Sequence, residues 1–140
     1  MGMGRSQKYH PRKRTLYALL FPSGHCYIGQ SVNPREREQQ HRRPTGSWNR
    51  PFDFLVLGEM VGTEAEAADY ECAWRLRAQA SGWRIYGKPP GLVVNPRRVA
   101  NSTHNRLART LKWPIQPTQK RASWWPWVVA AAVVAWLALS

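Results

Sequence analysis

Two short apolar runs on either side of a Pro-Ser-Gly turn constrain the fold of this chain more than any other feature. The first run, TLYALLF, spans residues 15–21, and the second, HCYIG, spans residues 25–29. Apolar and aromatic runs of this length, joined by turn-forming residues, are typical of a β-hairpin. The sequence therefore predicts a hairpin that closes at Pro22-Ser23-Gly24.

The length of the hairpin loop decides which side chains share a face. With a three-residue loop, Leu19 faces Tyr27 and Tyr17 faces Gly29. Tyr17 and Tyr27 then lie on one face of the ribbon, whereas a loop of even length would place them on opposite faces. Two tyrosines on one face are compatible with ordinary packing as well as with a functional site.

Capping signals predict a helix after the hairpin. Asn33 is a suitable N-cap, with Pro34 at the first helical position and Glu36 at the third. A helix is therefore expected from this point to about Arg43, where a following proline would stop it.

A third strand and a longer helix complete the expected domain. The apolar run FDFLVLGEM at residues 52–60 predicts a buried strand. Thr63-Glu64-Ala65-Glu66 is a second capping box, which opens a helix through Ala80, and a short helix is expected around residues 105–112. The order β-β-α-β-α predicts an α+β fold, in which helices flank a small antiparallel β-sheet of about three strands.

Charge is distributed very unevenly along the 140 residues. There are 21 Lys and Arg against 8 Asp and Glu, a formal net charge of +13, and all eight acids lie between Glu36 and Glu71. Two acid-free flanks cannot neutralise themselves locally, which indicates a polyanionic partner, either nucleic acid or anionic lipid. The two cysteines, Cys26 and Cys72, form neither a zinc-binding pattern nor a disulfide framework and fit a reducing compartment.

The composition divides the chain into four parts. Residues 1–14 are expected to be a flexible basic arm, residues 15–96 the folded domain, and residues 97–123 a basic linker with a short helix. Residues 124–140, WWPWVVAAAVVAWLALS, are expected to form an apolar C-terminal helix of roughly 26 Å. That length suits a membrane anchor in a thin bilayer, with Lys120 and its basic neighbour keeping the domain on the cytoplasmic side. The alternative is a terminal helix packed on the domain or in a dimer interface.

Polar side chains on the two predicted helices are candidates for a site. Arg37 and His41 are four residues apart and therefore share one helix face. The other bases of this helix also allow a simpler reading, a solvated basic surface. In the longer helix, Glu71 stands among apolar neighbours, where an ion pair with Arg75 at i+4 would explain it without any function.

Taken together, these residues resemble the GIY-YIG nuclease family. TLY at residues 15–17 and CYIG at residues 26–29 are similar to the two halves of the family signature, although Thr15 replaces its first glycine. The stretches SVNPREREQQH and YECAW are similar to helices of the branch-cutting members, whose Cys-rich zinc module is not encoded here. The resemblance covers about residues 15–95 and implies an endonuclease that acts on DNA, which could be branched or flapped.

The resemblance implies a role for each site residue. Glu71 would bind one Mg²⁺ ion, for which Mn²⁺ could substitute, and Arg37 would stabilise charge on the phosphoryl oxygens. Tyr17 and Tyr27 would be the general base and the water-positioning group, in an order left open, and a nearby cation and arginine would lower a phenol pKa. His41 would hold a phenol oxygen or relay its proton.

Further residues are implied in supporting roles. Gly29 and Asn95 match structural positions of the family, although Asn95 lies farther from the metal-binding glutamate than usual. Arg35, Arg42 and Arg43 are expected to contact the DNA backbone. Whether a protein partner supplies specificity is left open.

Two functions of other classes compete with a nuclease. One is a domain that binds nucleic acid at a membrane without cutting it, and the other is a purely structural membrane protein. A decayed nuclease would be expected to lose at least one of the five catalytic groups, and all five are present in this sequence.

Overall fold

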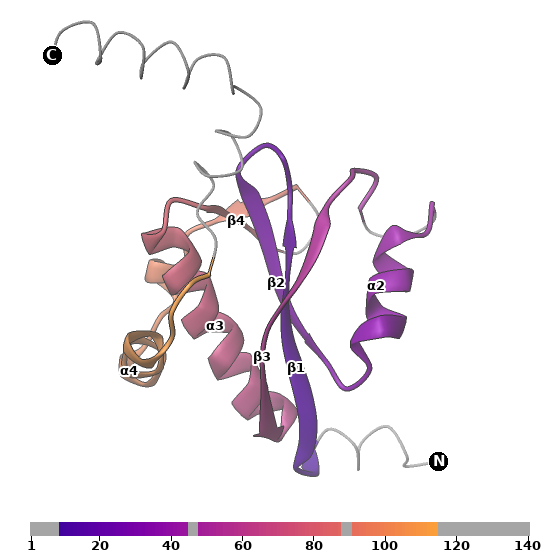
Figure 1. The fold of residues 1–140 in the computed structure, drawn as a ribbon. Helices are drawn as coiled ribbons and strands as arrows, with labels where there is room; N and C mark the ends of the chain where they lie inside the picture. The colour runs from indigo at the N-terminus through magenta and orange to yellow at the C-terminus, as the bar shows by residue number, and fades with distance from the viewer. Residues whose placement is uncertain (1–8, 45–47, 88–90, 115–140) are drawn as a thin grey trace, which may run out of the picture.

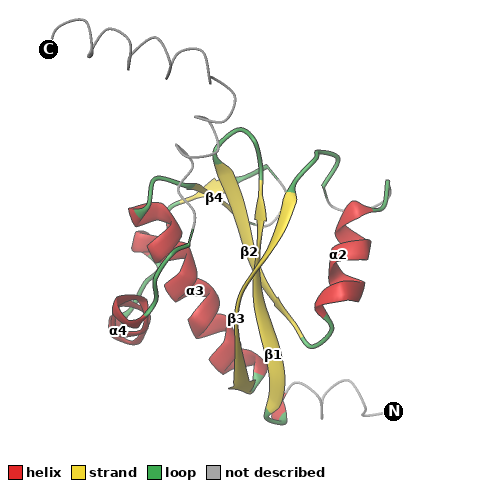
Figure 2. Ribbon diagram, viewed as in Figure 1, coloured by secondary structure: helices red, strands yellow, loops and turns green. Residues whose placement is uncertain are grey.

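The structure is a computed structural model that describes residues 9–44, 48–87 and 91–114. It contains a five-stranded mixed sheet with strand order β3-β1-β2-β4-β5. Helix α2 lies on one side of this sheet and α3 on the other, with α4 outside α3 (Figures 1 and 2). The elements are β1 (Arg12–Leu20), β2 (His25–Ser31), α2 (Pro34–Arg42), β3 (Asp53–Gly62), α3 (Glu64–Ala80), β4 (Arg84–Tyr86), β5 (Val93–Val94), the 3₁₀ helix η1 (Pro96–Arg98) and α4 (Ser102–Thr110).

The α+β class is confirmed, but the prediction of a small, purely antiparallel sheet of about three strands is wrong. The described part of the sheet has five strands, and β2 pairs with β4 in parallel. The two additional strands are only three and two residues long and lie among Gly and Pro residues. Runs this short show no alternating pattern, so their pairing depends on tertiary contacts rather than on a local signal.

The hairpin has the predicted register. Tyr17 pairs with Gly29 and Leu19 with Tyr27, and the backbone N–H of Phe21 donates to the carbonyl of His25 at 2.9 Å. The loop between β1 and β2 therefore contains three residues, as expected, and the two tyrosines lie on one face of the sheet.

The expected flexible arm at residues 1–14 is too long, because β1 begins at Arg12. Arg14 is buried, and its Nε donates to the carbonyl of Gly62 at 3.0 Å. Lys13 forms an ion pair with Glu59 at 3.1 Å. These bases pair with β3 along the sheet and are strand residues, while residues 1–8 lie outside the described part of the chain.

Strand β3 is present where the run FDFLVLGEM predicted it, but it is not a buried strand. It lies at the edge of the sheet and its side chains are mostly half-buried or exposed, with Val56 51% and Val61 72% exposed. An apolar run alone does not distinguish an edge strand from a central one, because the difference is set by which strands pair beside it.

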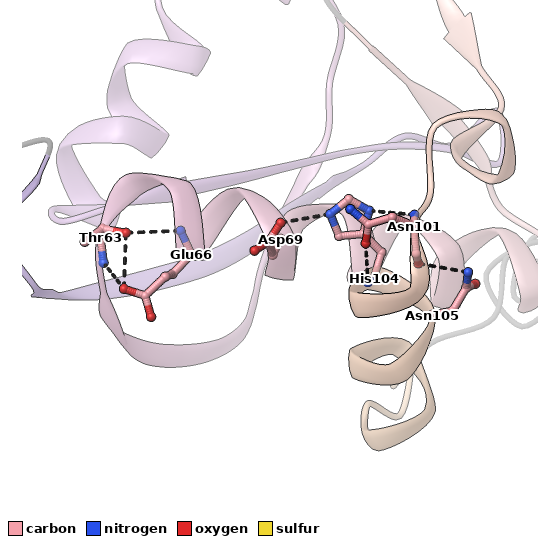
Figure 3. A network of polar contacts seen from close by, with 6 residues as sticks. All are labelled: Thr63, Glu66, Asp69, Asn101, His104 and Asn105. Carbon is pink, nitrogen blue, oxygen red and sulfur yellow. Dashed lines mark hydrogen bonds and ion pairs between the residues drawn. The ribbon is translucent and has the colours of Figure 1, made fainter.

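Both predicted helix starts are confirmed. The Asn33 side chain accepts a hydrogen bond from the Glu36 backbone N–H at 3.3 Å at the start of α2. At the start of α3, Thr63 Oγ1 accepts from the Glu66 N–H at 3.2 Å, and the Glu66 carboxylate accepts from the Thr63 N–H at 3.1 Å (Figure 3). These reciprocal bonds satisfy N–H groups that the helices leave unpaired at their first turns.

The expected linker at 97–123 is folded as far as the structure describes it. Helix α4 packs on α3, where His104 Nε2 lies 2.9 Å from Asp69 Oδ1 (Figure 3). After α4, the Trp113 side chain is buried against Trp74 and Trp83. The folded domain therefore extends beyond the predicted end at residue 96, since these side chains complete its core.

The expected apolar C-terminal helix, residues 124–140, lies outside the described residues. Among the residues that are described, none of the helices has the length and apolar character needed to cross a membrane.

Alternate residues of the hairpin contribute side chains to two separate cores, one on each face of the sheet. We call the cluster between the sheet and α3 the α3-side core; it includes Leu16, Ala18, Leu20, Cys26, Ile28, Trp74, Ala78, Trp83, Ile85 and Trp113. We call the cluster on the opposite face the α2-side core; it consists of Tyr17, Leu19, Phe21, Tyr27, Trp48, Phe52 and Tyr86. The first core is aliphatic and tryptophan-rich, whereas the second is aromatic and contains hydroxyl groups.

Candidate active site

The two tyrosines of the predicted site lie together in the α2-side core. Tyr17 comes from β1 and Tyr27 from β2, and their side chains are only 1% and 7% exposed. After burial, a negative charge on the Tyr27 phenol is the next cause that raises the pKa of Tyr17. The structure thus brings together the pair that the hairpin register predicted.

Gly29 has a steric reason to be glycine. A Cβ atom built on Gly29 would lie 2.5 Å from the Tyr17 hydroxyl oxygen and 2.7 Å from the ring carbon that bears it. The phenol therefore lies directly over the backbone of the opposite strand, a position that any larger residue would displace. Gly29 supports the site by allowing this close approach.

His41 lies against both tyrosines. Its Nε2 is 2.9 Å from the Tyr17 hydroxyl oxygen, which is hydrogen-bonding distance, and its ring meets the Tyr27 ring at 6.0 Å between centroids. His41 is the one buried residue of α2, at 8% exposure. The predicted contact between this imidazole and one of the phenols is present.

Arg37 is exposed one helical turn before His41, on the same face of α2. Its guanidinium charge lowers the pKa of both Tyr17 and Tyr27, so it acts on both phenols electrostatically. It also lines a small cavity of about 140 Å³ at the start of α2, together with the N-cap Asn33. Arg37 thus acts on the phenols and also faces solvent, where an anionic ligand can reach it.

Glu71 extends from the middle of α3, and its side chain is 20% exposed. After burial, which is the largest cause, the Glu71 carboxylate also raises the pKa of both phenols. Strand β4 pairs with β2 only as far as Tyr27, so the rest of that edge of β2 has no neighbouring strand in the described part of the sheet. Glu71 therefore influences the tyrosines through its charge, from a helix on the other side of the sheet (Figure 1).

The ion pair that would explain Glu71 without a function is also present. Arg75 Nη2 lies 3.5 Å from Glu71 Oε2, one helical turn away. A distance of 3.5 Å is long for a charge-assisted hydrogen bond, and both side chains are partly exposed. This pair is therefore weak, and it does not distinguish a structural carboxylate from a metal-binding one.

The expected lowering of a phenol pKa does not hold in the protein alone. Burial raises the pKa of Tyr17 and of Tyr27, and this desolvation outweighs the opposing effects of Arg37 on both phenols and of Arg75 on Tyr27. An ionised phenol in a largely dry aromatic cluster has lost its hydration, and the nearby guanidinium groups do not replace it. Both tyrosines are therefore neutral hydroxyl groups at neutral pH.

The donor set near the tyrosines fits a hydrated Mg²⁺ ion. Among the described residues, no three His, Cys, Asp or Glu side chains cluster closely enough to enclose a metal. Glu71 offers one partly exposed carboxylate. Mg²⁺ commonly keeps several waters and uses one or two carboxylates together with substrate phosphates, so this single ligand is compatible with it and does not suit a fully protein-enclosed ion.

The three arginines expected to bind DNA differ in their surroundings. Arg35 and Arg43 are exposed on or just after α2. Arg42 Nε pairs with Glu38 at 2.9 Å, its Nη1 donates to the Phe52 carbonyl at 3.1 Å, and its guanidinium lies 4.3 Å from the centre of the Phe52 ring. Arg42 is thus held in place by the protein, unlike the other two.

Sequence reasoning missed a basic pocket beside the tyrosines. Its volume is about 420 Å³, and it is lined by Arg42, Arg43, Pro44, Trp48, Asn49, Arg50, Pro51 and Phe52. The Arg50 guanidinium donates to the Tyr86 hydroxyl at 2.7 Å, and the Tyr86 ring stacks on His25 at 4.5 Å. The one available signal was the pairing of an aromatic and a basic residue, Trp48 and Arg50, within a Gly- and Pro-rich loop.

Asn95 lies in a different part of the molecule. Its side-chain oxygen accepts hydrogen bonds from Gln79 Nε2 and from the Arg97 backbone N–H, both at 3.1 Å. It caps η1 and ties that helix to the C-terminal end of α3, two turns beyond Glu71. These contacts fit the structural role that the sequence predicted and give it no place beside the tyrosines.

Comparisons of the chain with models of protein families, with curated proteins and with solved structures found no match. The likeness to GIY-YIG nucleases therefore remains a prediction that depends on the residues of this chain.

Proposed function

We propose that this protein is a metal-dependent endonuclease that hydrolyses DNA phosphodiester bonds on the α2 side of the sheet. The observation that carries the proposal is the hydrogen bond between the Tyr17 hydroxyl and His41 Nε2. This arrangement holds a phenol over a glycine and joins it to a buried imidazole, so a proton donor and a proton acceptor lie side by side in an aromatic cluster. It is well suited to moving a proton.

The raised pKa of the phenols determines how the proton would move. A neutral Tyr17 does not act as a base by itself, but it can accept a proton from water while its own proton passes to His41 Nε2. The imidazole of His41 is then the final acceptor. The water oxygen attacks phosphorus, the bond to the leaving oxygen breaks, and solvent protonates that oxygen. No free phenolate forms in this sequence.

Arg37 and Glu71 would act on the substrate. The exposed guanidinium of Arg37 offers two parallel donors to the phosphoryl oxygens, which carry more charge in the transition state than in the ground state. A Mg²⁺ ion, or Mn²⁺ in its place, would supply Lewis-acid stabilisation of the same charge when bound at Glu71. Tyr27, which is more exposed than Tyr17, would orient the attacking water.

The basic pocket next to the tyrosines would hold the DNA backbone on one side of the cleaved bond. Arg43 and Arg50 are exposed there, and Arg42 is fixed by the Phe52 carbonyl. Fixed and exposed guanidinium groups on one wall suit the regular spacing of phosphates. These contacts are to the backbone of the DNA and carry no base specificity.

A second candidate is a nucleic-acid-binding module that does not cut. One observation favours it: burial raises the pKa of both phenols and so keeps them neutral. In that case the tyrosines and His41 would serve packing, and the arginines alone would carry the function.

Replacing Glu71 separates these two candidates. Glu71→Gln should abolish cleavage of plasmid DNA in the presence of Mg²⁺ and leave DNA binding near the wild-type level, because it removes one charge and keeps the shape. Arg75→Gln breaks the same ion pair from the other side and should retain cleavage. Glu64→Gln, in the first turn of the same helix, is the control for loss of a negative charge. Equal activity of Glu71→Gln and wild type, or equal loss in Arg75→Gln, would contradict the metal-binding role.

We also propose that residues 124–140, which lie outside the described residues, anchor the protein to a membrane with the domain on the cytoplasmic side. The support is the composition of this segment, which has no charged residue. Expression of the full chain and of residues 1–122, followed by an alkaline carbonate wash of the membranes, tests this. Recovery of the full chain in the soluble fraction would contradict the anchor.

A further inference from the structure

Three arginines from three different elements line a second pocket, on the opposite side of the sheet from α2. Arg77 comes from α3, Arg97 from η1 and Arg109 from α4, and the cavity between them is about 400 Å³. The remaining lining is small or apolar, apart from one amide: Leu76, Ala80, Ala100, Asn105 and Ala108. None of these residues belongs to the site described above.

The positive charge of this pocket is not neutralised nearby in the sequence. No acidic residue follows Glu71, so η1 and α4 contain none. On α3 itself, Glu71 precedes Arg77 by six residues, which is about 9 Å along the helix axis, and it pairs with Arg75. Asp69 is two residues farther away and pairs with His104.

One donor of a residue that lines the pocket is buried and has no acceptor among the described residues. It is the Nε of Arg77, which forms no hydrogen bond in that part of the chain. A buried N–H group without an acceptor is unfavourable, and a turn of the Arg77 side chain toward an anion in the pocket would give it one. Arg97 and Arg109 are exposed at the rim and can turn toward the same anion.

The elements that carry these arginines are fixed relative to one another. Helix α4 is held on α3 by the contact between His104 and Asp69 at 2.9 Å, which Figure 3 shows, and by the buried side chain of Ala108. The start of η1 is tied to α3 through Asn95, which accepts from Gln79. The pocket is therefore pre-formed, and an anion would not have to pay the entropy of assembling it.

We propose that this arginine pocket binds a phosphodiester group of a second nucleic-acid segment, separate from the segment on the α2 side. Planar guanidinium groups match phosphate oxygens, and a recessed pocket between three elements suits a single protruding phosphate better than a flat lipid surface. Because α2 and α4 lie on opposite sides of the sheet (Figure 1), a stiff straight duplex lying along α2 does not reach the pocket. The ligand class rests on the proposed function.

A pair of double variants provides the test. Arg97→Gln/Arg109→Gln removes the two exposed arginines of the pocket. Arg98→Gln/Arg106→Gln removes the same charge from the same two elements, η1 and α4, at positions that do not line the pocket. Both should keep the thermal unfolding of the wild type because all four side chains are exposed. If the pocket variant unfolds, the single variant Arg109→Gln replaces it.

Binding of the full chain to a labelled three-way DNA junction and to a linear duplex of one of its arms is measured by fluorescence anisotropy over a range of salt, with EDTA present so that nothing is cleaved. In the pocket variant, we expect the affinity for the junction to fall about tenfold. The slope of log affinity against log salt concentration should become shallower by about one to two. The affinity for the duplex should change by less than about twofold. The control variant should change neither affinity by more than about twofold.

Each other outcome overturns the inference. Equal losses in the two variants would mean general attraction to charge rather than a pocket. Unchanged junction binding in the pocket variant, with reduced binding only to phosphatidylserine vesicles, would assign the pocket to lipid. A wild-type chain that binds no DNA would overturn this inference together with the proposed function, whereas normal cleavage without any effect of the pocket variant would overturn this inference alone.

Discussion

The two faces of the sheet are built from the same strands but differ in chemistry. On the α3 side, β1 contributes Leu16, Ala18 and Leu20 to an apolar core closed by tryptophans. On the α2 side, the intervening positions include Tyr17, whose hydroxyl meets His41 inside an aromatic cluster. A period-two strand can thus hold the fold with one face and present polar groups with the other. Within β1, the residues that face α3 therefore serve mainly stability, and Tyr17, which faces α2, serves the proposed activity.

In the comparison of the two faces, substitutions on the α2 side should have the larger effect on cleavage. Arg37→Ala should lower the rate of DNA cleavage by on the order of 10²–10⁴, the scale for loss of one pre-organised charge-stabilising donor. Arg35→Ala, two residues earlier on a different face of the same exposed helix, should cost far less. Single-turnover cleavage of both variants measures the difference. Equal losses would reduce both residues to general attraction for phosphate.

On the α3 side, a core substitution should affect stability and leave the chemistry intact. Leu20→Ala removes a fully buried side chain and should lower the free energy of unfolding by about 2–5 kcal/mol. Urea unfolding measures this loss. Below the unfolding transition, the cleavage rate of the folded variant should stay near that of the wild type, and a large loss of rate in the folded state would mean that the two faces are not separable.

Gly29 offers a way to disturb the α2 side without removing a polar group. Gly29→Ala adds a Cβ atom that must displace the Tyr17 phenol, and a displacement of about 1 Å can lower the rate about 10²-fold. Gly58→Ala, on the edge strand β3, meets nothing within 4 Å and is the matched control. Cleavage and urea unfolding of both variants test this. A wild-type rate for Gly29→Ala would show that the position of the phenol is unimportant.

The smallest expected effect is the dependence of stability on alkaline pH, and it differs between the faces. Burial raises the pKa of the Cys26 thiol, on the α3 side, above its ordinary 9.0, and that of the Tyr27 phenol, on the α2 side, above 10.0. A raised pKa means that the folded state holds the proton more tightly. The contribution of each group to the free energy of unfolding is therefore complete below the pKa that the group has in the unfolded chain. It is lost as the pH rises above that pKa, by at most about 1.4 kcal/mol per pH unit for each group.

The free energy of unfolding should therefore begin to fall near pH 9, where the Cys26 thiol ionises in the unfolded chain. It should fall more steeply above pH 10, where the phenols ionise there as well. Cys26→Ala should remove part of the earlier loss, and Tyr27→Phe part of the later one. Urea unfolding at a series of alkaline pH values, relative to neutral pH for each variant, measures both. Identical profiles for the two variants would contradict the assignment of the two groups.

Local signals account for the parts of the molecule that the sequence predicted. The hairpin register follows from the three residues between Phe21 and His25, and both helix starts follow from their capping residues. These features depend on neighbours in the sequence. Because this register pairs Tyr17 with Gly29, it places the two tyrosines on one face without any information from tertiary contacts.

Features that depend on distant residues were not predictable in this way. Strand β4 exists because its three residues pair beside β2, and Trp113 joins the core through Trp74 and Trp83. The raised phenol pKa values have the same origin, since burial by Trp48 and its aromatic neighbours is not visible from residue types near Tyr17. Sequence reasoning therefore found the polar groups of the candidate site but misjudged their environment.

The central claim is that the α2 side carries the chemistry through the bond between Tyr17 and His41. Its most direct test is the single-turnover rate of DNA cleavage by Tyr17→Phe at saturating Mg²⁺. We expect a loss of about 10²–10⁴-fold with little change in thermal unfolding. Tyr86→Phe, which removes another hydroxyl of the same core, bonded to Arg50, should cleave at nearly the wild-type rate. Wild-type cleavage by Tyr17→Phe, or an equal loss in Tyr86→Phe, would contradict the claim.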